Sequence, residues 1–155
     1  MNEFDEGPPT EGWARLAPAL IVSDLERSLS FWQEVLGFQL AYARREDDFF
    51  YLERAGAQVM LYERCGLYET GPLEHPFGRG IMLQIQVDDV DAILSALRTE
   101  AWPLTKDREE AWFRAGTVER GLLQFIVLDP DGYMLMIYQE IGVRPVAARH
   151  GRISQ

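Results

Sequence analysis

The stretch LDPDGYMLMIYQE, residues 128–140, decides the fold because it joins a tight turn to a strand that is apolar on both sides. The letters DPDG are typical of a turn, and the residues after them alternate along a strand. Met134, Met136 and Tyr138 point to one side, whereas Leu135, Ile137 and Gln139 point to the other. A strand with one face in water would carry polar residues on that face. We therefore predict that a helix covers one side and that the other side lines an apolar cleft.

The segments before this stretch repeat one order of predicted elements. Residues 16–22 form a strand, residues 23–36 form a capped helix that Gly37 ends, and short strands follow at 38–44, 48–54 and 57–63. After a connection rich in glycine and proline, the order recurs as a strand at 81–87, a helix at 88–101, a short strand at 102–105, a charged loop, and strands at 122–128 and 133–140. One helix cannot cover both faces of a four-stranded sheet. We therefore predict an α+β fold in which two βαβββ modules form curved mixed sheets around a shared cleft.

Length and composition fit one domain with short ends. A chain of 155 residues with 47% apolar residues suits a single folded core. We expect residues 13–142 to form this domain, with module one at about 16–63 and module two at about 80–140. Residues 1–12 are acidic and contain GPP, which predicts a mobile N-terminal arm. Residues 143–155 form a predicted basic tail that could fold over the domain or over a partner chain.

The net charge of −10 limits the partners of the chain. Nucleic acids and anionic membranes would be repelled, whereas a cationic ligand would be attracted. An acidic surface that only maintains solubility is the alternative explanation. No apolar run is long enough to cross a bilayer and residues 1–10 lack the pattern of a signal peptide, so we expect a cytoplasmic protein. The single cysteine, Cys65, excludes an internal disulfide and has no adjacent base, so we expect a packed side chain and not a nucleophile.

Four segments, in this order and spacing, resemble one known family. They are VSDLERSLSFWQEVLGF at 22–38, GAQVMLYE at 56–63, GRGIMLQIQVDDVDAI at 78–93 and QFIVLDPDGYMLMIYQEIG at 124–142. Together they resemble the vicinal oxygen chelate superfamily, which contains glyoxalases, bleomycin resistance proteins and dioxygenases. The resemblance covers nearly all of residues 16–142 and implies the fold of two βαβββ modules.

The resemblance also implies where a metal would bind. Enzymes of this superfamily hold a divalent ion with inward histidine or glutamate side chains, and the matching positions in this chain are Ala17, Met60, Met82 and Met136. A thioether is a soft, weak donor that does not replace a carboxylate or an imidazole. The two histidines, at positions 75 and 150, lie outside the predicted strands. We therefore predict no metal ion, no other cofactor and no catalytic residue.

Without a metal, the inward side chains suggest a binding cleft. The predicted ligand-binding set is Met60, Met82 and Met136, together with Tyr62, Gln84 and Tyr138 two residues along each strand. Such side chains suit a planar or amphipathic ligand, although methionines that merely fill a core are the alternative. A second predicted set, for stacking at a dimer interface, is Phe50, Trp102, Trp112 and Phe113, with the last two in the loop before the seventh strand. Ordinary core or interface aromatic residues are the alternative for this set.

The segments most resemble the bleomycin resistance branch, whose members sequester glycopeptide drugs without a reaction. We therefore predict a metal-free, non-catalytic protein that binds a cationic, bleomycin-like antibiotic in an acidic groove lined by aromatic residues. The free edges of four-stranded modules also predict a homodimer. Two alternatives stay open: a metal-dependent enzyme of the glyoxalase or dioxygenase type, and a module that binds another small amphipathic metabolite.

Overall fold

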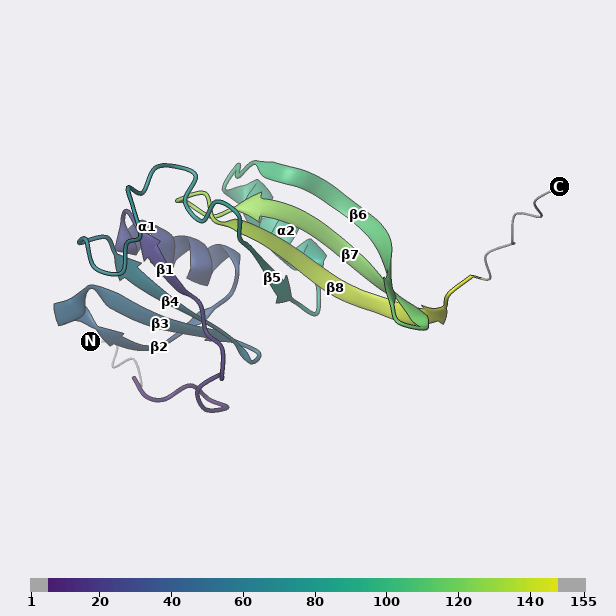
Figure 1. The fold of residues 1–155 in the computed structure, drawn as a ribbon, viewed down its shortest axis with the longest axis horizontal. Coiled ribbons are helices and arrows are strands. Elements are labelled where there is room, and N and C mark those ends of the chain that lie inside the picture. The colour runs from purple at the N-terminus through teal and green to yellow at the C-terminus, as the bar shows by residue number, and fades with distance from the viewer. Residues whose placement is uncertain (1–5, 148–155) are drawn as a thin grey trace.

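The structure is a computed structural model that describes residues 6–147 and contains eight strands and two α-helices (Figure 1). Module one consists of β1 (Ala19–Val22), α1 (Leu25–Ser30), a π-helical turn η1 (Phe31–Val35), β2 (Gln39–Arg44), a 3₁₀ turn η2 (Arg45–Asp47), β3 (Phe49–Arg54) and β4 (Ala57–Glu63). Module two consists of β5 (Met82–Gln86), α2 (Val90–Thr99), β6 (Leu104–Ala115), β7 (Val118–Leu128) and β8 (Met134–Pro145). The order of elements confirms the two predicted βαβββ modules.

Each module forms one mixed sheet of four strands. Sheet 1 has the order β1-β4-β3-β2 and sheet 2 the order β5-β8-β7-β6. In each sheet the first pair, β1 with β4 or β5 with β8, is parallel, and the other pairs are antiparallel. Both sheets therefore have the same topology, and the predicted α+β fold is confirmed.

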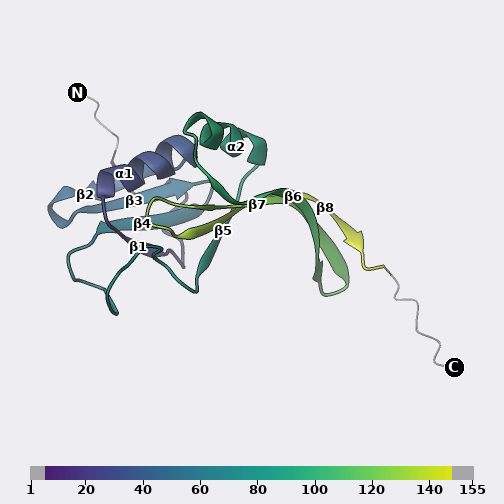
Figure 2. The ribbon, with the colours of Figure 1, turned by 90° about the horizontal axis from the view of Figure 1, so that it is seen from above.

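The helices begin where the sequence predicts them and cover one face of each sheet. The Asp24 carboxylate accepts a hydrogen bond from the Arg27 amide at 3.0 Å, and the Asp89 carboxylate accepts one from the Asp91 amide at 2.9 Å, so each aspartate caps its helix. Figure 2 shows α1 and α2 on the same side of the molecule, above their sheets. Because one face of each sheet is covered, the other face is open to ligands or to other segments.

A single apolar core joins the two modules. The largest fully buried side chains come from both of them: Trp32, Phe50, Leu52 and Leu61 from module one, and Leu97, Phe125, Leu135 and Ile137 from module two. The rings of Phe31 and Trp102 meet across the boundary with their centroids 4.8 Å apart. Burial of such side chains typically stabilises a fold by about 1.5–3 kcal/mol each. The modules consequently form one folded unit.

Strand β6 corrects the predicted charged loop. Residues 106–110, KDREE, belong to this strand, and β6 pairs with β7 as far as Ala115, opposite Val118. Charged side chains are tolerated there because β6 is the edge strand and most of it is exposed. Strands β7 and β8 are also longer than predicted, so the three strands extend beyond β5 as an arm, which we call the extension (Figures 1 and 2).

The two chain ends differ from the predicted arm and tail in their contacts. The Gly7 amide donates to the Ala41 carbonyl at 3.0 Å, and the Gln58 side chain donates to the Gly12 carbonyl at 2.7 Å, so residues 7–12 lie against sheet 1. The mobility of this arm stays a prediction. Residues 143–145 continue β8, whereas the predicted folding of the tail, with Arg149 and Arg152, falls outside the described residues. Within residues 6–147, no helix is long and apolar enough to span a bilayer.

Candidate functional site

The inward methionines lie on the faces of the two sheets that the helices do not cover, which we call the open faces. Val59 and Leu61 belong to the core, so Met60 and Tyr62 point to the open face of sheet 1. On sheet 2, the strand register sets Met82 beside Met134, Gln84 beside Met136 and Gln86 beside Tyr138. Leu135 and Ile137 are buried between these positions, so the six side chains share the open face of sheet 2. The structure thus places the predicted ligand-binding residues on two separate sheets. Met60 and Tyr62 lie on sheet 1, whereas sheet 2 carries Met82, Gln84, Met136 and Tyr138.

The residues at the four positions that a metal would need do not fit one. Ala17 has no donor atom, and Met60, Met82 and Met136 offer only thioethers. Within the part of the chain that the structure describes, no three side chains of histidine, cysteine, aspartate or glutamate are placed together to hold an ion. Hard divalent ions prefer oxygen and imidazole ligands. These positions therefore provide no coordination site of the kind the resemblance implies.

The second predicted set of aromatic residues does not form one group. Phe50 is buried in the core under the helices, and Trp102 packs on Phe31 and donates from Nε1 to the Leu128 carbonyl at 2.9 Å. Trp112 and Phe113 are consecutive residues of β6 and not of a loop, so they point to opposite faces of sheet 2. Phe113 is 48% exposed. Trp112 and Phe113 do not act together because consecutive side chains of a strand point to opposite faces of the sheet.

Trp112 instead packs inside the extension. Its ring lies so close to Gly121 that a Cβ atom on this glycine would come within 2.6 Å of it. The guanidinium of Arg144 lies over the same ring, 4.0 Å from a ring centroid. These contacts assign Trp112 to the packing of the extension.

An aromatic layer that was not predicted from the sequence lies on the open face of sheet 1. Tyr42 and Tyr51 stack with their ring centroids 5.0 Å apart, and Phe49 and Tyr62 lie 4.6 Å apart. The guanidinium carbon of Arg44 lies 3.8 Å from the centroid of Phe49. The signal in the sequence is the alternation within FFYLE, residues 49–53, in which Phe49 and Tyr51 share a face opposite to Phe50. Tyr62 of this layer, together with Arg44, also lines a pocket.

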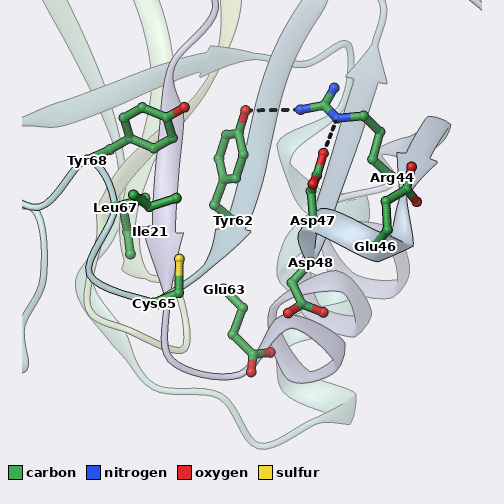
Figure 3. A pocket seen from close by; sticks show the side chains of 10 residues that line it. All are labelled: Ile21, Arg44, Glu46, Asp47, Asp48, Tyr62, Glu63, Cys65, Leu67 and Tyr68. Carbon is green, nitrogen blue, oxygen red and sulfur yellow. Dashed lines mark hydrogen bonds and ion pairs between the residues drawn. The ribbon is translucent and has the colours of Figure 1, made fainter.

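The pocket lies at one end of the open face of sheet 1 and has a volume of about 410 Å³ (Figure 3). This volume is within the usual range of about 300–1,000 Å³ for small-molecule sites. Its lining comes from β1, the end of β2, the turn η2, the end of β4 and the loop after β4. The lining residues are Ile21, Arg44, Glu46, Asp47, Asp48, Tyr62, Glu63, Cys65, Leu67 and Tyr68.

Arg44 forms hydrogen bonds with two other residues in the wall of this pocket. Arg44 donates from Nη2 to the Tyr62 Oη at 3.3 Å and from Nε to the Asp47 carboxylate at 2.9 Å. The hydrogen bond with Asp47 raises the pKa of Arg44, burial partly opposes this, and the bond to Tyr62 adds to the rise. Arg44 therefore stays a cation that donates to the phenol oxygen. The phenol hydrogen of Tyr62 is then left to donate to a ligand.

The carboxylates around the pocket differ in what they already bind. Glu63 accepts the backbone amide of Leu25 at 3.0 Å at the start of α1, and Asp47 is engaged by Arg44. Glu46 and Asp48 come from the turn η2 and its end, where Asp48 has a left-handed backbone with φ of 49°. Within residues 6–147 these last two carboxylates make no side-chain hydrogen bond or ion pair, in contrast to Glu63 and Asp47.

A buried network ties the turn of module two to the strand that lines this pocket. The Tyr133 hydroxyl donates to the Ile21 carbonyl at 2.7 Å, and the Ser23 amide donates to Asp131 at 2.9 Å. Asp129 is buried beside them and accepts the backbone amide of Tyr133 at 2.9 Å. Burial raises the pKa of Asp129 to about 6. The predicted turn DPDG is thus also the joint between the modules, and it positions Ile21 in the pocket wall.

Comparison with known proteins identifies similar chains. The family model of the Glyoxalase/Bleomycin resistance protein/Dioxygenase superfamily matches residues 12–137. A protein of Vibrio parahaemolyticus named probable lactoylglutathione lyase is 30% identical over 130 residues, which are 77% of this chain and 86% of the relative. The lactoylglutathione lyase of Haemophilus influenzae is 30% identical over 128 residues, which are 75% of this chain and 84% of the relative.

Solved structures show the same fold at low identity. A virulence protein from Salmonella typhimurium has a TM-score of 0.62 and 18% identity, with 83% of this chain and 98% of that chain covered. TioX from Micromonospora sp. ML1 has a TM-score of 0.63 and 18% identity, with 83% of this chain and 100% of that chain covered. These similarities concern the fold alone.

The names of the relatives correct the predicted function. A non-catalytic, metal-free protein that sequesters a bleomycin-like antibiotic was expected, but the curated relatives at about 30% identity are named as lyases. The expectation of no enzyme is therefore wrong by this comparison, and the alternative of a metal-dependent enzyme of the glyoxalase or dioxygenase type is favoured over it. The error arose because missing metal ligands were equated with missing chemistry. The bleomycin resistance branch gains no support, and the homodimer stays a prediction.

Proposed function

Because the chain belongs to the glyoxalase/bleomycin resistance/dioxygenase superfamily, we propose that it is a lyase-type enzyme that acts on a small organic substrate in the pocket around Tyr62 and Arg44. The lyase names of the relatives support the class of reaction. The observation that carries the site is the hydrogen bond from Arg44 to Tyr62 inside a pocket that also contains free carboxylates. This combination provides a proton donor and a proton acceptor within one cavity.

The proposed chemistry is general acid–base catalysis. A lyase breaks a bond by taking a proton from one atom of the substrate and giving a proton to the group that leaves. Tyr62 donates the proton, because Arg44 holds its oxygen and stabilises the charge that develops on it. Asp48 or Glu46 accepts the proton from the substrate. Ile21 and Leu67 provide an apolar surface against which the carbon atoms of the substrate pack.

Proton transfer is assigned to these side chains alone. The four positions that correspond to metal ligands provide no oxygen or nitrogen ligand, so they give no reason to route a step through an ion. Lactoylglutathione is the first substrate to test because the relatives carry its name. A panel of small carbonyl compounds with a leaving group on the β-carbon covers the wider class of elimination reactions.

The test measures substrate loss by nuclear magnetic resonance for the wild-type protein, Tyr62→Phe and Asp48→Asn. Removal of a positioned acid or base lowers a rate by about 10²–10⁴-fold, so Tyr62→Phe is expected to lose at least about 10²-fold in kcat. Asp107→Asn, an exposed change on β6 of module two, is the matched control and is expected to behave as the wild type. No turnover of any substrate in the panel, or full activity of both pocket variants, overturns the proposal.

Each reaction is also run with a chelator and with added divalent ions. If turnover requires an ion and is lost in Met60→Ala, the assignment of chemistry to protein side chains is wrong.

A further inference from the structure

The pocket around Tyr62 has an unequal set of charges. Its lining contains four carboxylates and one guanidinium, so the formal charge of the lining is −3 (four minus one). The only cation, Arg44, is already paired with Asp47 at 2.9 Å. Glu46, Asp48 and Glu63 are left without a side-chain cation among the lining residues. A negative potential inside a cavity with apolar walls is stronger than the same charges would produce on a flat surface.

The neighbouring arginines lie outside the lining of the pocket. Arg45 directs its guanidinium toward the ring of Phe50, 5.5 Å from its centroid, and Arg64 directs its guanidinium toward Phe77, at 5.8 Å. Neither arginine lines the pocket. Both lie next to lining residues in the sequence but stack on core aromatic rings instead.

Two large side chains at the pocket expose apolar surface that a bound ligand would cover. Leu67 is 62% exposed and Tyr68 is 77% exposed, and both belong to the loop after β4. The ring of Tyr68 meets Tyr62 in an edge-to-face contact at 5.8 Å (Figure 3). Aromatic faces attract organic cations, and apolar side chains bind the carbon atoms next to the charge. The pocket thus combines negative charge with an aromatic and apolar wall.

The geometry points to a substrate or ligand that is a small organic cation, with its positive charge at the acidic end of the pocket near Asp48 and a compact apolar body against Leu67 and the tyrosines. That this pocket is a catalytic site rests on the proposed function. That it binds an organic cation does not depend on the proposed function. The same lining would repel substrates with several carboxylates, so lactoylglutathione, which is tested only because the relatives carry its name, is expected to bind more weakly than a cation.

Cys65 provides a direct probe of the potential inside the pocket. It is the single cysteine, it is exposed, and it belongs to the lining. The protein is treated with matched thiosulfonate reagents that carry a trimethylammonium or a sulfonate group, and each rate is divided by the rate of the same reagent with N-acetylcysteine. The normalised rate of the cationic reagent is expected to exceed that of the anionic one by about tenfold at low salt, and the ratio is expected to approach one in high salt.

Two charge-removing variants assign the potential to named residues. Asp48→Asn and Glu46→Gln are each expected to lower the rate ratio about threefold, whereas Asp107→Asn leaves it unchanged. Asparagine tolerates the left-handed backbone of Asp48, so this change is expected to preserve the turn. Equal normalised rates for the two reagents in the wild-type protein overturn the inference.

Calorimetry with matched ligands tests binding itself. Choline, its neutral isostere 3,3-dimethylbutan-1-ol and the anion 3,3-dimethylbutanoate have similar shapes and differ in charge. Choline is expected to bind at least about fivefold more tightly than the alcohol, the anion is expected not to bind, and Tyr68→Ala is expected to weaken choline about fivefold. Equal affinity for choline and the alcohol overturns the inference.

The outcomes separate this inference from the proposed function. Choline binding together with absence of turnover for every substrate supports the cation site and rejects the lyase. Turnover of a neutral or anionic substrate that Tyr62→Phe abolishes, without any preference for choline, supports the lyase and rejects the cation site.

Discussion

Replacement of the buried Asp129 by asparagine is expected to change how the stability of the protein depends on pH. Asp129 is 2% exposed and lies in the turn that joins the modules. Burial raises the pKa of its carboxyl from 3.8 to about 6, although hydrogen bonds from the Tyr133 amide and from the Trp32 indole oppose the rise. In the unfolded chain the carboxyl regains its ordinary pKa.

The sign of the effect follows from the two pKa values. Between about pH 4 and pH 6 the folded chain binds more protons than the unfolded chain, so the free energy of unfolding falls as the pH rises through this interval and then levels off. At about 1.36 kcal/mol per pKa unit, a rise from 3.8 to about 6 corresponds to a loss of about 3 kcal/mol by pH 7. An asparagine at this position has no proton to release and therefore avoids this loss.

The assay is urea unfolding of the wild-type protein and Asp129→Asn at several pH values between about 4 and 7. The difference in unfolding free energy, variant minus wild type, is expected to rise by about 3 kcal/mol across this interval, whatever its absolute value. Subtraction removes the contribution of all other carboxylates, and Asp107→Asn is expected to give a constant difference. If the curves for Asp129→Asn and the wild type run parallel, the reasoning about the buried carboxyl is refuted.

Three further changes test the packing of the fold by urea unfolding. Tyr133→Phe removes the hydrogen bond to the partly buried Ile21 carbonyl, so a loss of about 1–3 kcal/mol is expected, and a loss below about 0.5 kcal/mol would show that this bond contributes little to the joint between the modules. Gly121→Ala would bring a Cβ atom within 2.6 Å of Trp112, and a loss of about 1–3 kcal/mol is expected, whereas Gly71→Ala meets no atom within 4 Å and is expected to be nearly neutral. Arg120→Ala removes an exposed ion pair with Glu140, for which a loss of at most about 1 kcal/mol is expected, and a larger loss would mean that the extension depends on this pair.

The sequence predicted the elements whose signals are local. A capped helix was predicted after residue 22 and another after residue 87, and the structure confirms both, with Asp24 and Asp89 as the caps and with the end of the first helix in a π-helical turn. The short strand predicted at 102–105 is the start of β6, but its continuation to Ala115 was missed because the KDREE segment has no apolar alternation and becomes a strand only by pairing with β7. Phe50 was predicted to stack at a dimer interface, whereas in the structure it belongs to the core because its side chain points opposite to Phe49 and Tyr51.

The pocket could not be predicted because no local pattern unites its residues. Ile21, Arg44 and Tyr62 come from three strands, and Tyr68 comes from the loop after β4. Only the order β1-β4-β3-β2 and the turn η2 bring them together. A sequence pattern identifies residues that share one element, whereas a site built from several elements depends on the way the chain folds back on itself.

The extension implies that the two ends of β7 differ in the free energy needed to open them locally. Phe125 and Val127 of β7 are fully buried, whereas Val118, Glu119 and Arg120 of the same strand are partly exposed. The residues at the start of β7 pair only with their two neighbouring strands, at Ala115 and Pro145, so few buried contacts oppose their separation. Backbone amides near Arg120 should therefore exchange with deuterium through local opening, and those near Phe125 only when the whole domain unfolds.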